Sequence, residues 1–282
     1  MILKRLTIFI CILFVTAAGR GQMMESYVQE GEFGVAVGAG HYFGDLNTRA
    51  ALNRPKFSAG AFFRKQFGNY IGVKLAANYA RLGYSDVYSE NEIQKRRNLS
   101  FNSNIWEVSL SGDFNFFKFY PGISGFTYTP YVSLGVGVFS YDPYAYLGDQ
   151  KYFLRAIGTE GQGSALYPER KAYGSMGVCF PVAVGFKYNV SPSVNMFAEV
   201  GYRFTNADYL DDVSMTYAPD AFSPLPNGSP SIGQLLSDRS YETGVPIGIK
   251  NRQRGNSQQK DAYVLAQIGV SFNISSYRCP KF

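Results

Sequence analysis

This 282-residue sequence has little of several things that mark common functional classes. It contains one histidine, three cysteines and one tryptophan, and only 17% of its residues are charged. With a single histidine, the chain has only one candidate for a histidine-based catalytic site. The sequence contains no paired cysteines and no cysteine–histidine spacing that would suggest a zinc site. Beyond the first 22 residues, no apolar run approaches the roughly 18 residues that a membrane helix needs. A helical membrane protein is therefore excluded.

Glycine and aromatic residues are abundant instead. The chain has 30 Gly, 22 Tyr and 23 Phe, and 16% of its residues are aromatic. Low charge combined with this aromatic content excludes a disordered chain. Aromatic and β-branched residues interspersed with glycine favour strands over helices. The composition therefore predicts an all-β protein.

The N-terminus predicts export. Lys4 and Arg5 precede an apolar stretch from Leu6 to Ala18, and Gly19 and Gly21 are small residues before Gln22. This pattern is typical of a secretory signal peptide, which we place at residues 1–21, leaving a single mature domain at 22–282. Cleavage removes three basic residues and no acids, so 24 basic residues face 21 acids and the formal charge falls from +6 to +3. The weakened basic excess argues against a nucleic-acid partner.

Two cysteines remain after cleavage, Cys179 within a predicted strand and Cys279 in the C-terminal tail. An exported protein can form a disulfide, but the bond needs Cα atoms within about 7 Å. Because the two positions lie in such different parts of the chain, free cysteines are the favoured alternative.

Alternating polar and apolar residues predict eight strands. In the last of them, Ala262, Val264, Ala266, Ile268 and Val270 share one face. Most of the runs reach the 9 to 11 residues of a tilted transmembrane strand, whereas ordinary strands have about five or six. The predicted strands span 32–42, 57–66, 71–84, 104–117, 127–141, 174–188, 194–204 and 261–274.

The connections between these strands alternate in length. Long ones span 43–56, 85–103, 142–173 and 205–260, and short ones span 67–70, 118–126 and 189–193. Outer-membrane barrels have an even number of strands, long extracellular loops and short periplasmic turns. The sequence therefore predicts an eight-stranded antiparallel up-and-down transmembrane β-barrel in the outer membrane of a Gram-negative bacterium, surrounded by outer-membrane lipids.

The alternative is a secreted, soluble eight-stranded barrel with its apolar face inward. The polar face argues against it, because this face is rich in glycine and poor in the charges that a water-exposed surface carries. Turned inward, its charged residues must pair with one another, and eight strands leave no room for a water-filled channel. The predicted lumen network consists of Arg64, Lys74, Glu107, Asp113, Lys187, Glu199 and Arg203, with Glu32 at the rim.

Aromatic residues near strand ends are expected at the membrane interfaces. They are Tyr42, Tyr70, Tyr84, Tyr128, Tyr188 and Tyr202, with Phe57 and Phe116. Pro130 and Pro181 fall within predicted strands, where each is expected to mark a bulge or a local end of pairing.

Candidate chemistry is sparse, and no enzyme activity, metal site or cofactor is predicted. His41 has a register that points away from the lumen, so a structural role is favoured over catalysis. Asp208, Asp211 and Asp212 would share one face of a helical turn and could collect calcium, although a capped turn is favoured. The basic run 95–97 is interpreted as a solvated loop tip rather than a lipopolysaccharide contact. Residues 232–238 are expected to form one or two helical turns.

Three loop segments together carry a resemblance to a known family, and we call them the familiar segments. The first, 42–47, contains Gly44 and Asp45. The second is Thr159, Glu160, Gly161, Gln162 and Gly163, whose glycines alone would be only a weak anion cradle. The third, 208–214, begins with Asp208, Tyr209, Leu210, Asp211 and Asp212. With eight strands and a final strand ending at 267–274, the chain resembles the PorG family of outer-membrane barrels, which belong to the type IX secretion system of Bacteroidetes.

This resemblance implies a non-enzymatic barrel that anchors a periplasmic ring of PorK-like and PorN-like proteins. By topology, the surface open to such a ring is the short-turn rim, and Gly122 and Tyr277 are the predicted contact positions. The alternative is a free-standing barrel for adhesion or envelope integrity, of the OmpX/OmpA kind, which would act through its long loops.

Overall fold

The computed structural model describes residues 27–277, with side chains from 30–274. The chain divides into two compact units, and the larger, Gln29–Ile274, contains most of the strand residues. The predicted signal peptide and Cys279 lie outside the described residues. None of the helices in the described part of the chain is long and apolar enough to cross a membrane.

All eight predicted strands are present, and each is 12 to 17 residues long. Their bounds differ from the predicted ones by a few residues, and β1 differs most because it begins five residues earlier. They are β1 (Tyr27–Phe43), β2 (Lys56–Phe67), β3 (Ile71–Ser85), β4 (Ser100–Asn115), β5 (Tyr128–Ser140), β8 (Met176–Ser191), β9 (Val194–Thr205) and β10 (Ala262–Tyr277).

These strands form a closed antiparallel barrel. The sheet order runs β3-β2-β1-β10-β9-β8-β5-β4, and a further pairing of β3 with β4 joins the two ends. Apart from β1 beside β10, each barrel strand pairs with its neighbours in the chain, which is up-and-down topology. Closure leaves none of the eight strands with an open edge along its full length. The predicted fold class is confirmed.

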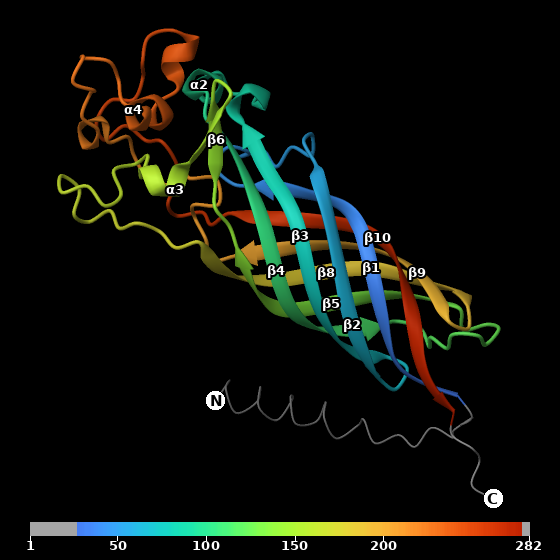
Figure 1. The fold of residues 1–282 in the computed structure, drawn as a ribbon. Coiled ribbons are helices and arrows are strands. Elements are labelled where there is room, and N and C mark those ends of the chain that lie inside the picture. Colours follow the sequence, from blue (N-terminus) through green and yellow to red (C-terminus); the bar gives the residue numbers. More distant parts are fainter. Residues whose placement is uncertain (1–26, 278–282) are drawn as a thin grey trace, which may run out of the picture. The chain divides into compact units, whose positions relative to one another are not determined.

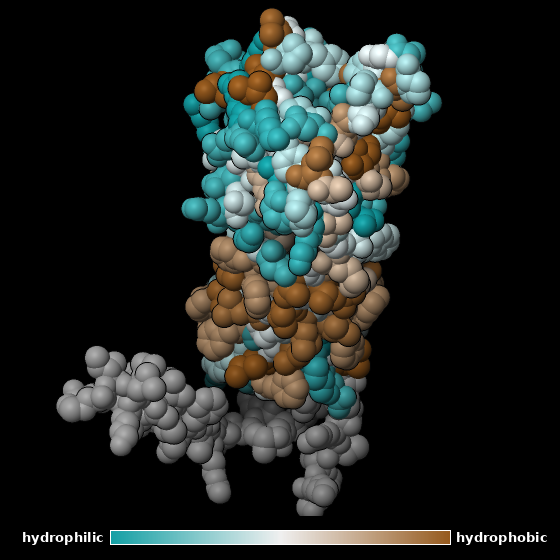
Figure 2. Space-filling view, turned by 90° about the vertical axis from the view of Figure 1, so that its left-hand side faces the viewer, coloured by the Kyte–Doolittle hydropathy of each residue, from teal (hydrophilic) through white to brown (hydrophobic). Residues whose placement is uncertain are grey.

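The apolar face of the barrel points outward. On β4, Trp106 is 65% exposed and Val108 is 51% exposed, whereas Glu107, which lies between them, is buried. Asp113, farther along the same strand, is buried as well. Figure 2 shows hydrophobic residues gathered over the barrel on this face, with hydrophilic residues over the loops above them. The soluble barrel with an apolar lumen is therefore excluded, because its alternation would be the reverse.

The two prolines interrupt pairing as expected. Pro130 lies one residue beyond the β4–β5 ladder, which ends at the pair Asn115 and Tyr131. The β5–β8 ladder stops at the pair Leu134 and Val182 and resumes at Gly137 and Cys179, so it is broken where Pro181 lacks an N–H.

The long connections carry additional structure that gathers at one end of the barrel (Figure 1). We call the four connections 44–55, 86–99, 141–175 and 206–261 the cap. The cap contains a hairpin of β6 (Tyr144–Leu147) and β7 (Gln150–Phe153), and helices α2 (Glu92–Arg97) and α3 (Leu154–Ile157), none of which the sequence pattern predicted. The predicted helical segment is confirmed as α4 (Ile232–Ser237). Short 3₁₀ turns are η1 (Asp86–Tyr88), η2 (Pro219–Ala221) and η3 (Ser240–Thr243).

The largest apolar core lies where the barrel mouth meets the cap. Tyr42, Phe101 and Tyr263 from the strands pack there with Leu210 and Leu236 from the cap. The expectation that Tyr42 and Tyr84 are interfacial aromatics is therefore wrong, since both are buried in this core. Tyr42 has the same register as the lumen-facing glycines of β1, so its ring turns into the barrel mouth rather than to the outer face of the barrel.

Candidate functional site

The lumen is filled by buried ion pairs in layers. In the first layer Arg64 pairs with Glu32 and places Nε 2.5 Å from Asp113 Oδ2, while Lys187 Nζ lies 3.3 Å from Glu32 Oε1. Glu32 also accepts a hydrogen bond from Ser271. Glu32 was predicted at the rim, but it is fully buried inside this layer because β1 begins at Tyr27.

Two further layers follow along the lumen. Lys74 Nζ lies 2.6 Å from Glu199 Oε2, which also accepts a hydrogen bond from Tyr131 at 2.7 Å. Arg203 Nε lies 3.2 Å from Glu107 Oε2, and the Tyr263 hydroxyl donates to the same oxygen at 2.6 Å. The structure thus places every residue of the predicted network in an ion pair.

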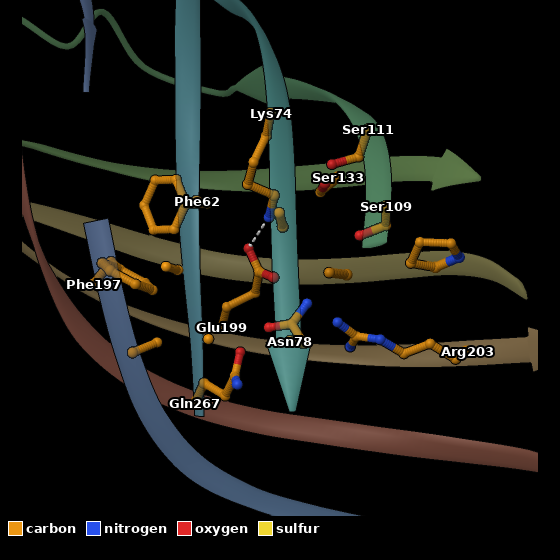
Figure 3. Close-up of a pocket in the computed structure, with 16 residues that line it drawn as sticks. Phe62, Lys74, Asn78, Ser109, Ser111, Ser133, Phe197, Glu199, Arg203 and Gln267 are labelled. Atoms are coloured by element: carbon orange, nitrogen blue, oxygen red, sulfur yellow. Dashed lines mark hydrogen bonds and ion pairs between the residues drawn. The ribbon is translucent and has the colours of Figure 1, made fainter. Parts of the chain in front are cut away.

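A cavity of about 30 Å³ remains between these layers, lined by Lys74, Glu199 and Arg203 among others (Figure 3). It has room for about one or two water molecules. Side chains therefore fill the lumen, and the four carboxylates named above are matched by four bases. This arrangement can neutralise charge inside the barrel, and a barrel of eight strands is expected to be too narrow for a continuous water-filled path.

The second and third familiar segments contact each other in the cap. The Glu160 carboxylate accepts hydrogen bonds from the backbone amides of Ser214 and Met215 at 3.0 and 2.9 Å, and Arg254 lies 3.0 Å away. The Thr159 hydroxyl donates to Asp212, which also accepts from Tyr173 at 2.6 Å. The anion held here is therefore the chain's own glutamate, so segment 159–163 supplies an anion rather than binding one.

Segment 159–163 owes its shape to its two glycines. Gly161 and Gly163 both have a positive φ, at 80° and 77°, which favours glycine. The Gln162 side chain accepts the backbone N–H of Glu160 at 2.9 Å. These turns place the Glu160 carboxylate toward residues 214–215.

The first familiar segment contacts the third through the hydroxyl of Tyr42. Tyr42 Oη lies 2.5 Å from Asp211 Oδ2 and 3.2 Å from Asp261 Oδ1. Gly44 lies against this contact, because a Cβ there would overlap both the Asp261 carboxylate and the Tyr42 hydroxyl. Asp45 accepts the backbone N–H of Asn256 at 2.8 Å. The three segments therefore form one packed unit inside the cap.

The three aspartates of segment 208–212 do not converge. Asp208 accepts from Ser214, Asp211 from Tyr42, and Asp212 from Thr159 and Tyr173. No helix forms here, so the shared helical face that could collect calcium is absent. In the described part of the chain, no three His, Cys, Asp or Glu side chains are grouped to hold a metal ion.

Burial changes the acidity of the cap carboxyls. It raises the pKa of Asp45 to about 6, and it does the same for Asp212 although Arg254 acts in the opposite direction. Burial, with repulsion from Asp45, raises the pKa of Asp211 well above its ordinary value. Burial and repulsion from Asp211 do the same for Asp261. The cap therefore contains carboxyls that its own packing disfavours in the charged form.

The basic run 95–97 is only partly the predicted solvated tip. Arg97 is buried and forms two hydrogen bonds of 2.7 Å with the carboxylate of Asp86. It also donates to the backbone carbonyl of Asp45 at 3.1 Å. The expectation is wrong for Arg97, because helix α2 turns this side chain into the cap while Lys95 stays exposed.

Comparison with known families identifies a match over most of the chain. Residues 4–229 match the family model described as "Domain of unknown function (DUF6089)". The chain belongs to the DUF6089 family. No curated protein matches it.

Several solved structures are similar to this DUF6089 chain. Neisserial surface protein A has 11% sequence identity and a TM-score of 0.43, with 89% of this chain and 100% of that chain covered. OprG from Pseudomonas aeruginosa has 11% identity and a TM-score of 0.37, with 89% and 98% covered. Ail from Yersinia pestis has 12% identity and a TM-score of 0.36, with 87% and 99% covered. The fold rests on the strand pairing of this chain itself, and these distant similarities add no functional conclusion.

His41 is held by the cap. Its Nε2 lies 2.6 Å from the carbonyl oxygen of Ala51, and its ring packs edge-on against Phe43 and Tyr84. Among the residues that the structure describes, no serine, threonine or cysteine side chain hydrogen-bonds with His41. These contacts anchor loop 44–55 to the end of β1.

The short-turn rim is small and ordered. Gly122 has a φ of 84°, and its N–H donates to the Asn189 side chain at 2.9 Å, which ties turn 116–127 to the end of β8. Ile123 and Phe126 in the same turn are exposed. Tyr277 is the last residue of β10, and its side chain lies outside the described part. Cys179 is a buried free cysteine in β8.

Sequence reasoning missed the polar residues that complete the lumen. Tyr131 and Tyr263 donate to the network carboxylates, and Asn195 donates to Glu32 at 3.1 Å. Their lumen-facing register was a usable signal, because a tyrosine among glycines on the inner face needs a polar partner.

Proposed function

We propose that this protein is a non-enzymatic outer-membrane barrel that conducts no bulk solute and acts through its two rims. The reversed polarity of the barrel carries this proposal: Trp106, Val108 and Leu110 are exposed on β4, and ion pairs fill the lumen. Only a hydrocarbon surrounding makes such an exterior favourable, and strands of 12 to 17 residues are long enough to cross it.

Membrane fractionation tests this location. The protein is expected in the outer-membrane fraction and in solution only with detergent. Trp106, the one tryptophan of the chain, should show blue-shifted fluorescence that lipids carrying a brominated acyl chain quench. Recovery as a soluble protein, or a Trp106 signal insensitive to brominated lipid, would refute the membrane assignment.

Within the membrane, the protein serves the type IX protein secretion machinery as the anchor of a periplasmic ring. The resemblance of segments 42–47, 159–163 and 208–214 to the PorG family supports this role. The exposed Ile123 and Phe126 offer apolar contacts on the short-turn rim.

A photo-crosslinking amino acid at Ser124 tests this role, since Ser124 is exposed between Ile123 and Phe126 and leaves Gly122 intact. The expected product is a conjugate with a periplasmic ring protein, identified by mass. The matched control is the same amino acid at Asn227, an exposed cap position that should yield no such conjugate. An unchanged exported proteome after deletion of the gene would refute the secretion role.

The ordered cap favours a second candidate function, a free-standing barrel for adhesion or envelope integrity. Long loops that served only as connections would not need buried ion pairs such as Arg97–Asp86 and Arg254–Glu160. In this case shortening the cap loop 206–261 would reduce surface binding, while secretion stays intact.

A further inference from the structure

A cleft lies between the first two connections of the cap, next to the site described above. Its volume is about 230 Å³, and loop 44–55 forms one wall while the end of β3, turn η1 and the start of α2 form the other. The lining includes Thr48, Arg49, Asn53, Tyr84, Tyr88 and Glu90. The first packed segment contributes Leu46 and Asn47 to one wall, and the rest of the lining belongs neither to the packed segments nor to the lumen network.

Both walls are fixed by hydrogen bonds. The Asn47 side chain accepts from the Ala51 N–H at 2.9 Å and donates to the carbonyl oxygen of Tyr42 at 2.9 Å. Gln94 bridges the walls by donating to the carbonyl oxygen of Asp45 at 3.2 Å and to the Thr48 hydroxyl at 3.3 Å. A cleft that is already formed loses little ordering entropy when it binds a ligand.

One part of the cleft is aromatic. The rings of Tyr84 and Tyr88 meet edge to face with centroids 5.7 Å apart. The guanidinium of Arg54 lies 3.8 Å from the centre of the Tyr88 ring, which fixes its orientation. Tyr84 is buried in the apolar core behind this contact, so Tyr88, which is 39% exposed, is the tyrosine that offers ring surface and a hydroxyl to a ligand.

The residues that line the rest of the cleft are polar, and their charges cancel, since the Arg54 guanidinium over Tyr88 is not part of this lining. Arg49 and Glu90 form an ion pair of 2.5 Å across the two walls, and both remain largely exposed, at 62% and 83%. The lining contains both donors and acceptors, from the Arg49 guanidinium, the Asn53 amide and the Glu90 carboxylate. An anion would compete with Glu90 for Arg49, and an acyl chain would desolvate these groups without replacing their hydrogen bonds.

From these features we infer that the cleft binds one neutral sugar residue. Hydroxyl groups both donate and accept, so a polyol matches a mixed and uncharged polar wall, while the C–H face of a sugar ring packs on tyrosine. The volume is below the roughly 300–1,000 Å³ of pockets that hold drug-sized ligands, which suits a single ring rather than an extended peptide. The sugar comes either from the cell's own surface polysaccharide or from outside the cell.

Saturation-transfer NMR on the full protein in nanodiscs tests this inference and avoids detergents that carry sugar headgroups. The probes are glucose, galactose, mannose, rhamnose and N-acetylglucosamine, followed by polysaccharide released from the cell's own lipopolysaccharide and by oligosaccharides that the cell does not make. At least one monosaccharide is expected to bind, and the two later arms identify its source. The absence of binding by every probe would overturn the inference, as would preferential binding of a sulfated or acidic sugar.

Two variants locate the site. Tyr88→Ala should weaken binding at least tenfold, whereas Tyr88→Phe, which keeps the ring, should weaken it less. The matched control is Tyr146→Ala, which removes an exposed tyrosine from the β6–β7 hairpin and should leave binding unchanged. Equal binding by the wild type and Tyr88→Ala would place the sugar elsewhere and refute the assignment. Heat-dependent gel mobility confirms that each variant has a folded barrel.

Discussion

Replacing Arg64 by methionine tests whether the lumen network determines the stability of the barrel. Arg64 is 1% exposed and bonds with both Glu32 and Asp113. After its removal, Lys187 is the one base among the described residues that stays paired with Glu32. Removing one partner from a buried ion pair leaves an uncompensated charge and costs about 3–5 kcal/mol. With a urea m-value of about 1–3 kcal/mol/M, the unfolding midpoint should fall by at least about 1 M.

Lys65 provides the matched control on the same strand. Its side chain is 48% exposed on the outer face and lies 4.0 Å from Glu30, so Lys65→Met should change stability by about 0–1 kcal/mol. The double variant Arg64→Met with Asp113→Leu restores charge balance and should recover part of the loss. The assay is urea unfolding in lipid vesicles, followed by Trp106 fluorescence. If Arg64→Met costs no more than Lys65→Met, the lumen pairs do not stabilise the barrel as described.

Three other predictions concern the cap and the lumen. The raised pKa of Asp261 means that its contribution to stability is present below its unfolded pKa of about 4 and is lost as pH rises toward the folded value. Proteolysis of the cap, corrected for protease activity on an unfolded substrate, should therefore be faster at pH 8 than at pH 5, and Asp261→Asn should reduce this difference. An equal ratio of the two rates in the wild type and in Asp261→Asn would contradict the prediction. Gly44→Ala should destabilise the cap by about 1–3 kcal/mol, because the added Cβ overlaps Asp261 and Tyr42. Gly112→Ala on β4 should be neutral, because a Cβ added there meets no other residue within 4 Å. Hydrogen exchange of the cap amides measures the effect of both variants, and equal protection in the two would argue against the close contact at Gly44. In planar bilayers the wild type should give no steady conductance, and open channels of constant size would show that the lumen is not sealed.

The strands were predictable because an apolar exterior imposes one rule on all of them. Outward positions such as Trp106, Val108 and Leu110 must be apolar, so period-two alternation persists along each strand. The same rule placed the lumen charges, since a charged residue on the inner register can only pair within the barrel. This rule predicted the ends of the strands poorly, because the alternation fades toward the ends, as at the start of β1.

The cap was not predictable in the same way, because its contacts join residues that are far apart in the chain. Tyr42 bonds with Asp211, 169 positions away, and Arg97 donates to the carbonyl oxygen of Arg254. No local period marks such partners. The hairpin of β6 and β7 escaped notice for a related reason, since its strands are four residues each and too short to show alternation.

The packing of the three familiar segments changes what a defect in them would mean. Glu160, Asp211 and Gly44 are buried, and their contacts hold the cap together rather than line a surface. A variant in these segments should therefore disorder the cap while the barrel, stabilised by its own lumen pairs, still inserts. A secretion defect in such a variant would implicate the cap as a whole. A defect confined to residues 116–127, with the cap intact, would implicate the short-turn rim, so the two rims can be separated by comparing Gly44→Ala with a variant at Ile123.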